Sequence, residues 1–165
     1  MENMGKLRNM ASIYLSCEDK MLLLFRQGSR VVNDLWVGSA GGHFEAEEYN
    51  DAKACVLREL KEELSVTEDM LSDLQLRYIT MRRTKDEIRV NYYFFAELKG
   101  GMEIELSSNE GILKWFASEE ITKLQMPFTA KYVIEHYLKE GKNNEMIYGG
   151  IGDGEKVVFT KMPEF

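Results

Sequence analysis

The sequence is poor in the features that mark secreted, membrane-spanning and nucleic-acid-binding proteins. It has only two cysteines, Cys17 and Cys55, and their separation matches no metal-binding spacing, so we expect reduced thiols in a cytoplasmic protein. It contains no run of about 18 apolar residues and no apolar signal core near its start, which predicts no membrane partner. The net charge of -7 argues against a nucleic-acid polymer, because phosphate backbones bind basic faces.

Low-complexity linkers and internal repeats are also absent. The 165 residues are 44% hydrophobic, enough for one core, so we expect a single domain over 1–165. Alternating and helical patterns predict a mixed α/β (α+β) fold. The expected strands are 11–16, 21–26, 74–83, 88–98, 112–116 and 156–160, and a turn is expected at 150–154. The expected helices follow residue 50, follow a cap at Ser118, and span 128–140.

The most informative stretch is an acidic run on a predicted amphipathic helix, Arg58-Glu59-Leu60-Lys61-Glu62-Glu63. Spacings of three and four residues place Glu59, Glu62 and Glu63 on one arc, and Asn50 or Asp51 is positioned to cap the helix. The small residues Ala52 and Cys55 lie on the acidic side, where we expect them to leave room for a ligand. The apolar arc facing a core contains Val56, Leu57, Leu60 and Leu64.

Three carboxylates on one arc repel one another, and a hard divalent cation such as Mg²⁺ removes that repulsion. The alternative is a solvated face on which Arg58 pairs with Glu62. The residues before the helix favour the metal site. Gly41 and Gly42 follow an apolar stretch and precede an acidic loop, and we expect them to form a tight turn beside the helix.

The order of these residues resembles the signature of the Nudix hydrolase family, in its MutT-like branch. That signature is Gly, five residues, Glu, seven residues, then Arg-Glu-apolar-any-Glu-Glu-any-Gly-apolar. Gly42 and Glu48 keep the first spacing, but nine residues separate Glu48 from Arg58, so the box is two residues longer and either Glu45 or Glu48 takes the loop glutamate's part. Ser65 replaces the family's glycine at a position that often needs a left-handed backbone.

The resemblance implies the Nudix fold, a mixed sheet between helices, and hydrolysis of a nucleoside diphosphate linked to a further group. By resemblance, the cofactor is Mg²⁺, with Mn²⁺ as the alternative, held by the carbonyl of Gly41 and the carboxylates of Glu59, Glu62 and Glu63. Glu62 or Glu63 would also polarise the attacking water. Arg58 would orient the carboxylates. Glu110, in an Asn-Glu-Gly turn before a tryptophan-containing strand, resembles the additional glutamate of many family members.

The candidate substrate-binding residues are Arg26 and Arg30 for phosphate, with His43 and Tyr93 as further contacts. For each, the alternative is an ordinary structural or solvated role. Further positive charge lies on the hairpin of strands 74–83 and 88–98, at Arg82, Arg83 and Arg89. For these residues too, the alternatives are phosphate binding and an ordinary surface position.

The resemblance favours a nucleoside triphosphate substrate, such as the oxidised purine 8-oxo-dGTP, cleaved to monophosphate and pyrophosphate. The alternatives are an ADP-ribose or dinucleotide pyrophosphatase and a nucleotide sensor without catalysis. We expect a monomer or a homodimer.

Overall fold

A mixed β-sheet forms the centre of the molecule. The computed structural model describes residues 5–27 and 34–164, and the strands in this part pair in the order β3-β2-β1-β6-β5-β8-β9, with β4 on β1 and β7 on β2. The β1–β6 and β5–β8 pairs are parallel and the other pairs are antiparallel. The strand bounds are β1 (Lys6–Cys17), β2 (Lys20–Arg26), β3 (Leu35–Val37), β4 (Ala40–His43), β5 (Leu71–Thr84), β6 (Glu87–Leu98), β7 (Gly111–Ala117), β8 (Tyr148–Gly152) and β9 (Val157–Lys161).

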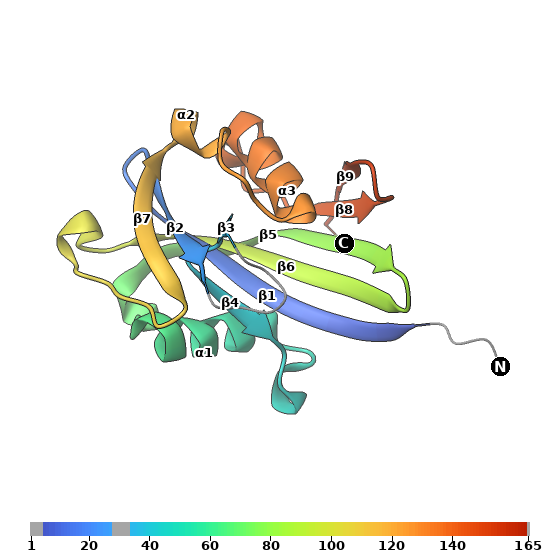
Figure 1. The fold of residues 1–165 in the computed structure, drawn as a ribbon, viewed down its shortest axis with the longest axis horizontal. Coiled ribbons are helices and arrows are strands. Elements are labelled where there is room, and N and C mark those ends of the chain that lie inside the picture. The colour runs from blue at the N-terminus through green and yellow to red at the C-terminus, as the bar shows by residue number, and fades with distance from the viewer. Residues whose placement is uncertain (1–4, 28–33, 165) are drawn as a thin grey trace.

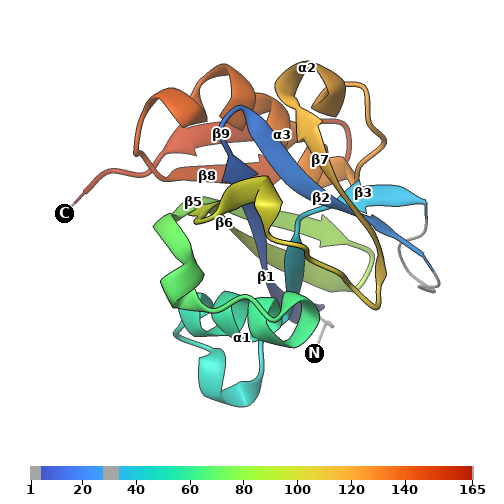
Figure 2. The ribbon, with the colours of Figure 1, turned by 90° about the vertical axis from the view of Figure 1, so that its left-hand side faces the viewer.

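Helices cover the sheet on both sides. Helix α1 (Ala52–Leu64) lies on one side, and α2 (Ser118–Ile121) and α3 (Phe128–Lys139) lie on the other (Figures 1 and 2). The prediction of a mixed sheet between helices is confirmed. In the part of the chain that the structure describes, none of the helices has the length and apolar character needed to cross a membrane.

Side chains of β1 alternate between two cores, one on each face of the sheet. Ala11, Ile13 and Leu15 are buried with the apolar arc of α1, whereas Tyr14 is buried on the opposite face with residues of α3. This alternation is the period of two that a strand imposes on its side chains. Because β1 runs through the middle of the sheet, its two faces connect the two layers of the fold.

Local chemistry sets both ends of α1. The side chain of Asp51 accepts a hydrogen bond from the amide of Ala54 at 3.0 Å, so Asp51 is the N-terminal cap. At the other end Ser65 adopts the left-handed conformation, with φ 56° and ψ 29°. Its amide donates to the carbonyls of Leu60 and Lys61, which ends the helix without glycine.

Four local predictions were wrong. Gly41 and Gly42 lie in strand β4, paired with β1, and form no turn. Cys55 is fully buried in the core under α1, so it leaves no room for a ligand. Ala117, not Ser118, is the cap residue of α2, and its amide donates to Glu120. The expected turn at 150–154 is partly strand, because β8 extends to Gly152 to pair with β5 and β9.

The left-handed residue at the end of α1 gives a stability prediction. Ser65→Gly removes the Cβ strain of that conformation and should raise the free energy of unfolding by up to about 1 kcal/mol, measured by urea denaturation. Ser65→Ala is the matched control, because it keeps the Cβ and should show no gain. A clear loss of stability in Ser65→Gly would contradict this account of the helix end.

Candidate active site

Arg58 lies at the centre of the acidic residues. Its Nε donates to Glu48 Oε2 at 2.8 Å and its Nη2 donates to Glu48 Oε1 at 2.9 Å, a two-pronged pair that matches a guanidinium to a carboxylate. Nη2 also donates to the carbonyl of His43 at 3.1 Å. The pair ties helix α1 to the preceding loop, which contains the short 3-10 helix Ala46–Glu48, and to the end of β4.

The third nitrogen of the guanidinium binds two acids of the signature. Nη1 of Arg58 donates to Glu59 Oε1 at 2.9 Å and to Glu62 Oε2 at 3.1 Å. One cation thereby fixes the orientation of carboxylates that would otherwise repel one another. Hydrogen bonding from Arg58 lowers the pKa of Glu48 to about 2, so Glu48 is ionised throughout the physiological range.

The two candidate loop glutamates, Glu48 and Glu45, occupy different environments. The Glu48 side chain is 8% exposed and bonded to Arg58, whereas the Glu45 side chain is 56% exposed and lies 3.6 Å from Arg58 Nε. In addition, Glu48 Oε1 accepts from the amide of Glu45 at 2.9 Å. The geometry therefore gives Glu48 the anchoring contact of the loop.

The two glycines of β4 let the backbone approach the acidic helix closely. A Cβ on Gly42 would lie 2.3 Å from Glu59 Oε1, and a Cβ on Gly41 would lie 2.7 Å from the carbonyl oxygen of Ala11. The amide of Gly41 donates to Glu63 Oε2 at 3.1 Å. Strand β4 and helix α1 are thus in contact through groups that any larger residue would displace.

Glu63 meets a carboxylate from a distant part of the chain. Burial raises the pKa of Glu63, and the charge of Glu110, which precedes β7, raises it further. Burial also raises the pKa of Glu59, although Arg58 opposes this shift. Arg26 Nη2 lies 3.6 Å from Glu110 Oε2. The result is a cluster of half-buried acids with a cation at its edge.

The donor set of this cluster suits a hard divalent cation. Each candidate side-chain donor is a carboxylate, the group that Mg²⁺ and Mn²⁺ prefer. The pKa values of Glu59 and Glu63 are raised first by burial and to a lesser extent by neighbouring carboxylates, and a bound cation would favour the ionised forms. Across residues 5–27 and 34–164, no three His, Cys, Asp or Glu side chains surround a single point. In this arrangement Glu59 and Glu62 both accept from Nη1 of Arg58.

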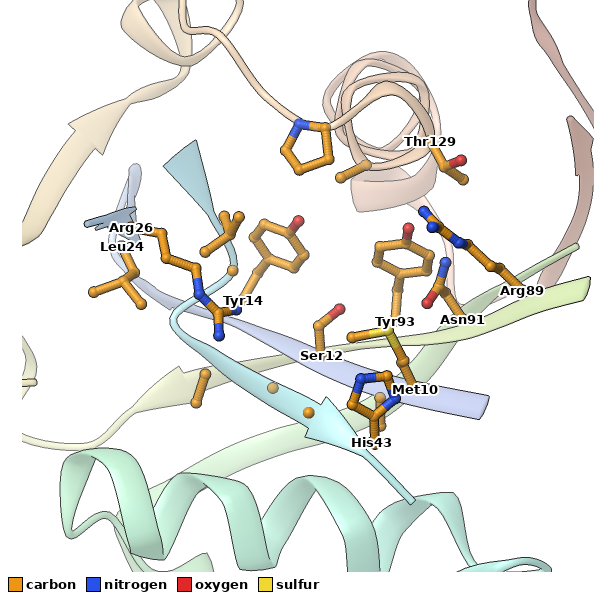
Figure 3. A pocket seen from close by; sticks show the side chains of 18 of the residues that line it. Met10, Ser12, Tyr14, Leu24, Arg26, His43, Arg89, Asn91, Tyr93 and Thr129 are labelled. Carbon is orange, nitrogen blue, oxygen red and sulfur yellow. The ribbon is translucent and has the colours of Figure 1, made fainter. Parts of the chain in front are cut away.

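A cavity of about 370 Å³ opens beside the cluster. Its floor is the α3-facing side of the sheet, and Figure 3 shows Tyr14 and Tyr93 rising from the floor between Arg26 on one side and Arg89 on the other. Thr129, at the start of α3, lies opposite in Figure 3, and Pro127 and Phe128 also line the cavity. Glu63 and Glu110 line the end nearest α1. The cavity therefore joins a nucleotide-sized space to the carboxylate cluster.

The cavity brings together most of the residues proposed from the sequence. Arg26, Gly41, His43, Glu63, Glu110 and Tyr93 line it, whereas Glu59 and Glu62 face Arg58, and Arg30 lies outside the described residues. Sequence reasoning missed Arg8, Met10, Ser12 and Asn91. For Arg8, Met10 and Ser12 the signal was the alternation along β1, which begins at Lys6 and not at Ala11. Asn91 lies on β6, paired with Met10.

Because the folded-state pKa of Glu48 lies below the ordinary value of 4.5, the Arg58–Glu48 pair predicts a pH dependence of stability. Its contribution is present above about pH 4.5 and is lost as pH falls toward 2. Glu48→Gln should therefore lower the free energy of unfolding at pH 7 by about 2 kcal/mol. The difference from the wild type should shrink between pH 4.5 and 2, which denaturant unfolding at several pH values measures.

Glu45→Gln is the control for this measurement. Its side chain is largely exposed, so the change should alter stability by no more than about 0.5 kcal/mol. Two results would show that Glu48 does not anchor the loop. One is an equal loss of unfolding free energy in both variants, and the other is a difference between the wild type and Glu48→Gln that stays constant across the acid range.

A family model for the NUDIX domain matches residues 6–137. The fold is similar to that of the MutT protein from Bacillus halodurans, with a TM-score of 0.68 at 22% identity, covering 96% of this chain and 99% of that chain. The fold is also similar to that of the MutT protein from Methanosarcina mazei Go1, with a TM-score of 0.67 at 20% identity, covering 84% of this chain and 97% of that chain.

The Ap4A hydrolase of C. elegans has the same fold, with a TM-score of 0.65 at 18% identity, covering 83% of this chain and 99% of that chain. A comparison with curated proteins gave no match. The family match spans most of the chain and includes the acidic helix, the glycine pair and Glu110. The chain therefore belongs to the NUDIX domain family and is a hydrolase with a MutT-like fold.

Proposed function

We propose that this Nudix hydrolase cleaves the pyrophosphate bond of a nucleoside triphosphate and releases a monophosphate and pyrophosphate. The proposed substrates include oxidised purine nucleotides such as 8-oxo-dGTP. The observation that carries the proposal is the contact between the cavity and the acidic cluster through Glu63 and Glu110. This arrangement supports a nucleoside in the cavity with its phosphates against the carboxylates.

The cation is Mg²⁺, or Mn²⁺ in its place, with Glu59, Glu62 and Glu63 as the carboxylates that hold it. When bound, it supplies positive charge to the phosphate oxygens and acidifies a coordinated water. Glu63 is the better candidate to accept the proton of the attacking water, because it lines the cavity, whereas Glu62 is 57% exposed and bonded to Arg58.

Two arginines have separate parts in this scheme. Arg58 donates to Glu48, Glu59 and Glu62 and does not line the cavity, so it positions these carboxylates. Arg26 lines the cavity and lies beside Glu110, which supports a contact with a substrate phosphate. Tyr14 and Tyr93 lie in the floor of the cavity beneath the nucleoside, and both are almost completely buried. The cytoplasmic location and the choice between monomer and homodimer stay predictions.

Isosteric substitution tests the carboxylates. Glu63→Gln should lower kcat by roughly 10²-fold or more, because the amide neither accepts the proton nor holds a divalent cation well. It should leave thermal stability equal or higher, since it removes a charge that burial and Glu110 disfavour. Glu47→Gln, an exposed neighbour of Glu48, is the control and should change neither quantity. Wild-type turnover in Glu63→Gln would refute its role.

Product analysis tests the reaction itself. The protein is incubated with Mg²⁺ and dGTP, 8-oxo-dGTP, ADP-ribose or diadenosine tetraphosphate, and the products are separated by chromatography. Monophosphate plus pyrophosphate from a triphosphate is the expected result, and EDTA should abolish it until excess Mg²⁺ is restored. Cleavage confined to ADP-ribose or the dinucleotide would reassign the substrate. Nucleotide binding without any cleavage would favour a sensor.

A further inference from the structure

Three arginines form a row across the floor of the cavity, at the end away from Glu63. In the sheet register Arg8 of β1 pairs with Arg89 of β6, and Arg89 pairs with Arg82 of β5. All three side chains line the cavity. Like charges at directly paired positions of neighbouring strands destabilise a sheet, so this arginine row needs negative charge nearby.

The described residues supply only part of that charge. Glu87 accepts from Arg8 Nη1 at 3.2 and 3.3 Å and from Arg89 Nε at 3.0 Å, so one carboxylate serves two guanidinium groups. Arg8 Nη2 also lies 2.8 Å from Nε2 of His43, and because arginine only donates, that ring nitrogen is the acceptor. His43 therefore adds a neutral partner and no charge.

Arg82 has no carboxylate partner among the residues described. Its guanidinium stacks over the ring of Phe128 at 4.4 Å, and its buried Nε has no hydrogen-bond acceptor in the described chain. A buried donor without an acceptor costs stability, and a ligand oxygen would satisfy it. The arginine row thus carries three positive charges against one carboxylate, inside a protein whose net charge is -7.

The space between the two ends of the cavity is uncharged. Ser12 pairs with Gly41, close to Glu63, and Arg8 lies four residues earlier on β1, or about 13 Å along the strand. Between these levels the floor presents Met10, Ser12, Asn91 and Tyr93. Figure 3 shows these neutral side chains between Arg26 and Arg89.

We propose that the substrate carries a second phosphate, separated by a nucleoside from the pyrophosphate that is cleaved, and that Arg8, Arg82 and Arg89 bind it. The inference rests on the proposed function, because the acidic end is taken as the site of cleavage. Arginine forks are suited to phosphate oxygens, and Arg82 supplies donors that the protein itself leaves unused. A ribose that is phosphorylated at its 2′- or 3′-hydroxyl provides a phosphate in this position.

Binding of compounds that contain no pyrophosphate bond tests the inference without requiring hydrolysis. Calorimetry compares AMP with adenosine 2′,5′-bisphosphate and adenosine 3′,5′-bisphosphate in the presence of Mg²⁺. The wild type should bind one bisphosphate at least about tenfold more tightly than AMP. Arg82→Gln and Arg89→Gln should remove this preference and leave AMP affinity unchanged. Arg83→Gln is the matched control, since Arg83 is exposed and adjacent to Arg82 on the same strand.

The two bisphosphates distinguish the position of the phosphate. Tighter binding of the 2′,5′ compound assigns the row to a 2′-phosphate, and tighter binding of the 3′,5′ compound assigns it to a 3′-phosphate. No preference for either bisphosphate over AMP, or a preference that both Arg82→Gln and Arg89→Gln retain, would overturn the inference. Failure of the proposed hydrolysis would appear separately, in the product assay.

Discussion

The site depends on one guanidinium group that holds several carboxylates in place. Arg58 contacts Glu48, Glu59 and Glu62 and the carbonyl of His43, so a single side chain joins the loop, the helix and the end of β4. Without it, the acids of α1 would repel one another and rotate toward solvent. A planar group with several fixed donors can satisfy this number of acceptors at once, and a lysine cannot.

Close backbone approach is the second constraint. Gly42 leaves room for the carboxylate of Glu59, and the amide of Gly41 binds Glu63, so β4 packs against the acidic side of the helix while Val56, Leu60 and Leu64 fill the core behind it. Gly41 and Gly42 lie in an ordinary strand. A larger residue would not fit at either position, because its Cβ would be too close to neighbouring atoms. The acidic side chains and the core side chains therefore occupy adjacent sides of the same thirteen-residue helix.

Short-range features of the fold could be predicted because neighbouring residues determine them. The cap at Asp51, the left-handed Ser65 and the alternation of the strands follow from local chemistry. The arginine row could not be predicted, because it arises where three strands from distant parts of the chain come into register. Arg82 and Arg83 looked equivalent in the sequence, and only the pairing of Arg82 with Arg89 places it in the cavity. Likewise, the choice of Glu48 over Glu45 depended on which one accepts hydrogen bonds from Arg58 in the folded protein.

The parallel pairing of β1 with β6 has a consequence for how the protein folds. The hydroxyl of Ser16 donates to the carbonyl of Ala96, 80 residues later, and this contact belongs to a ladder that runs the length of both strands. Closing so large a loop costs chain entropy before most of the sheet forms, so the fold has a high contact order and should form slowly. During synthesis on the ribosome, the edge of β1 that pairs with β6 stays unpaired until β6 has emerged.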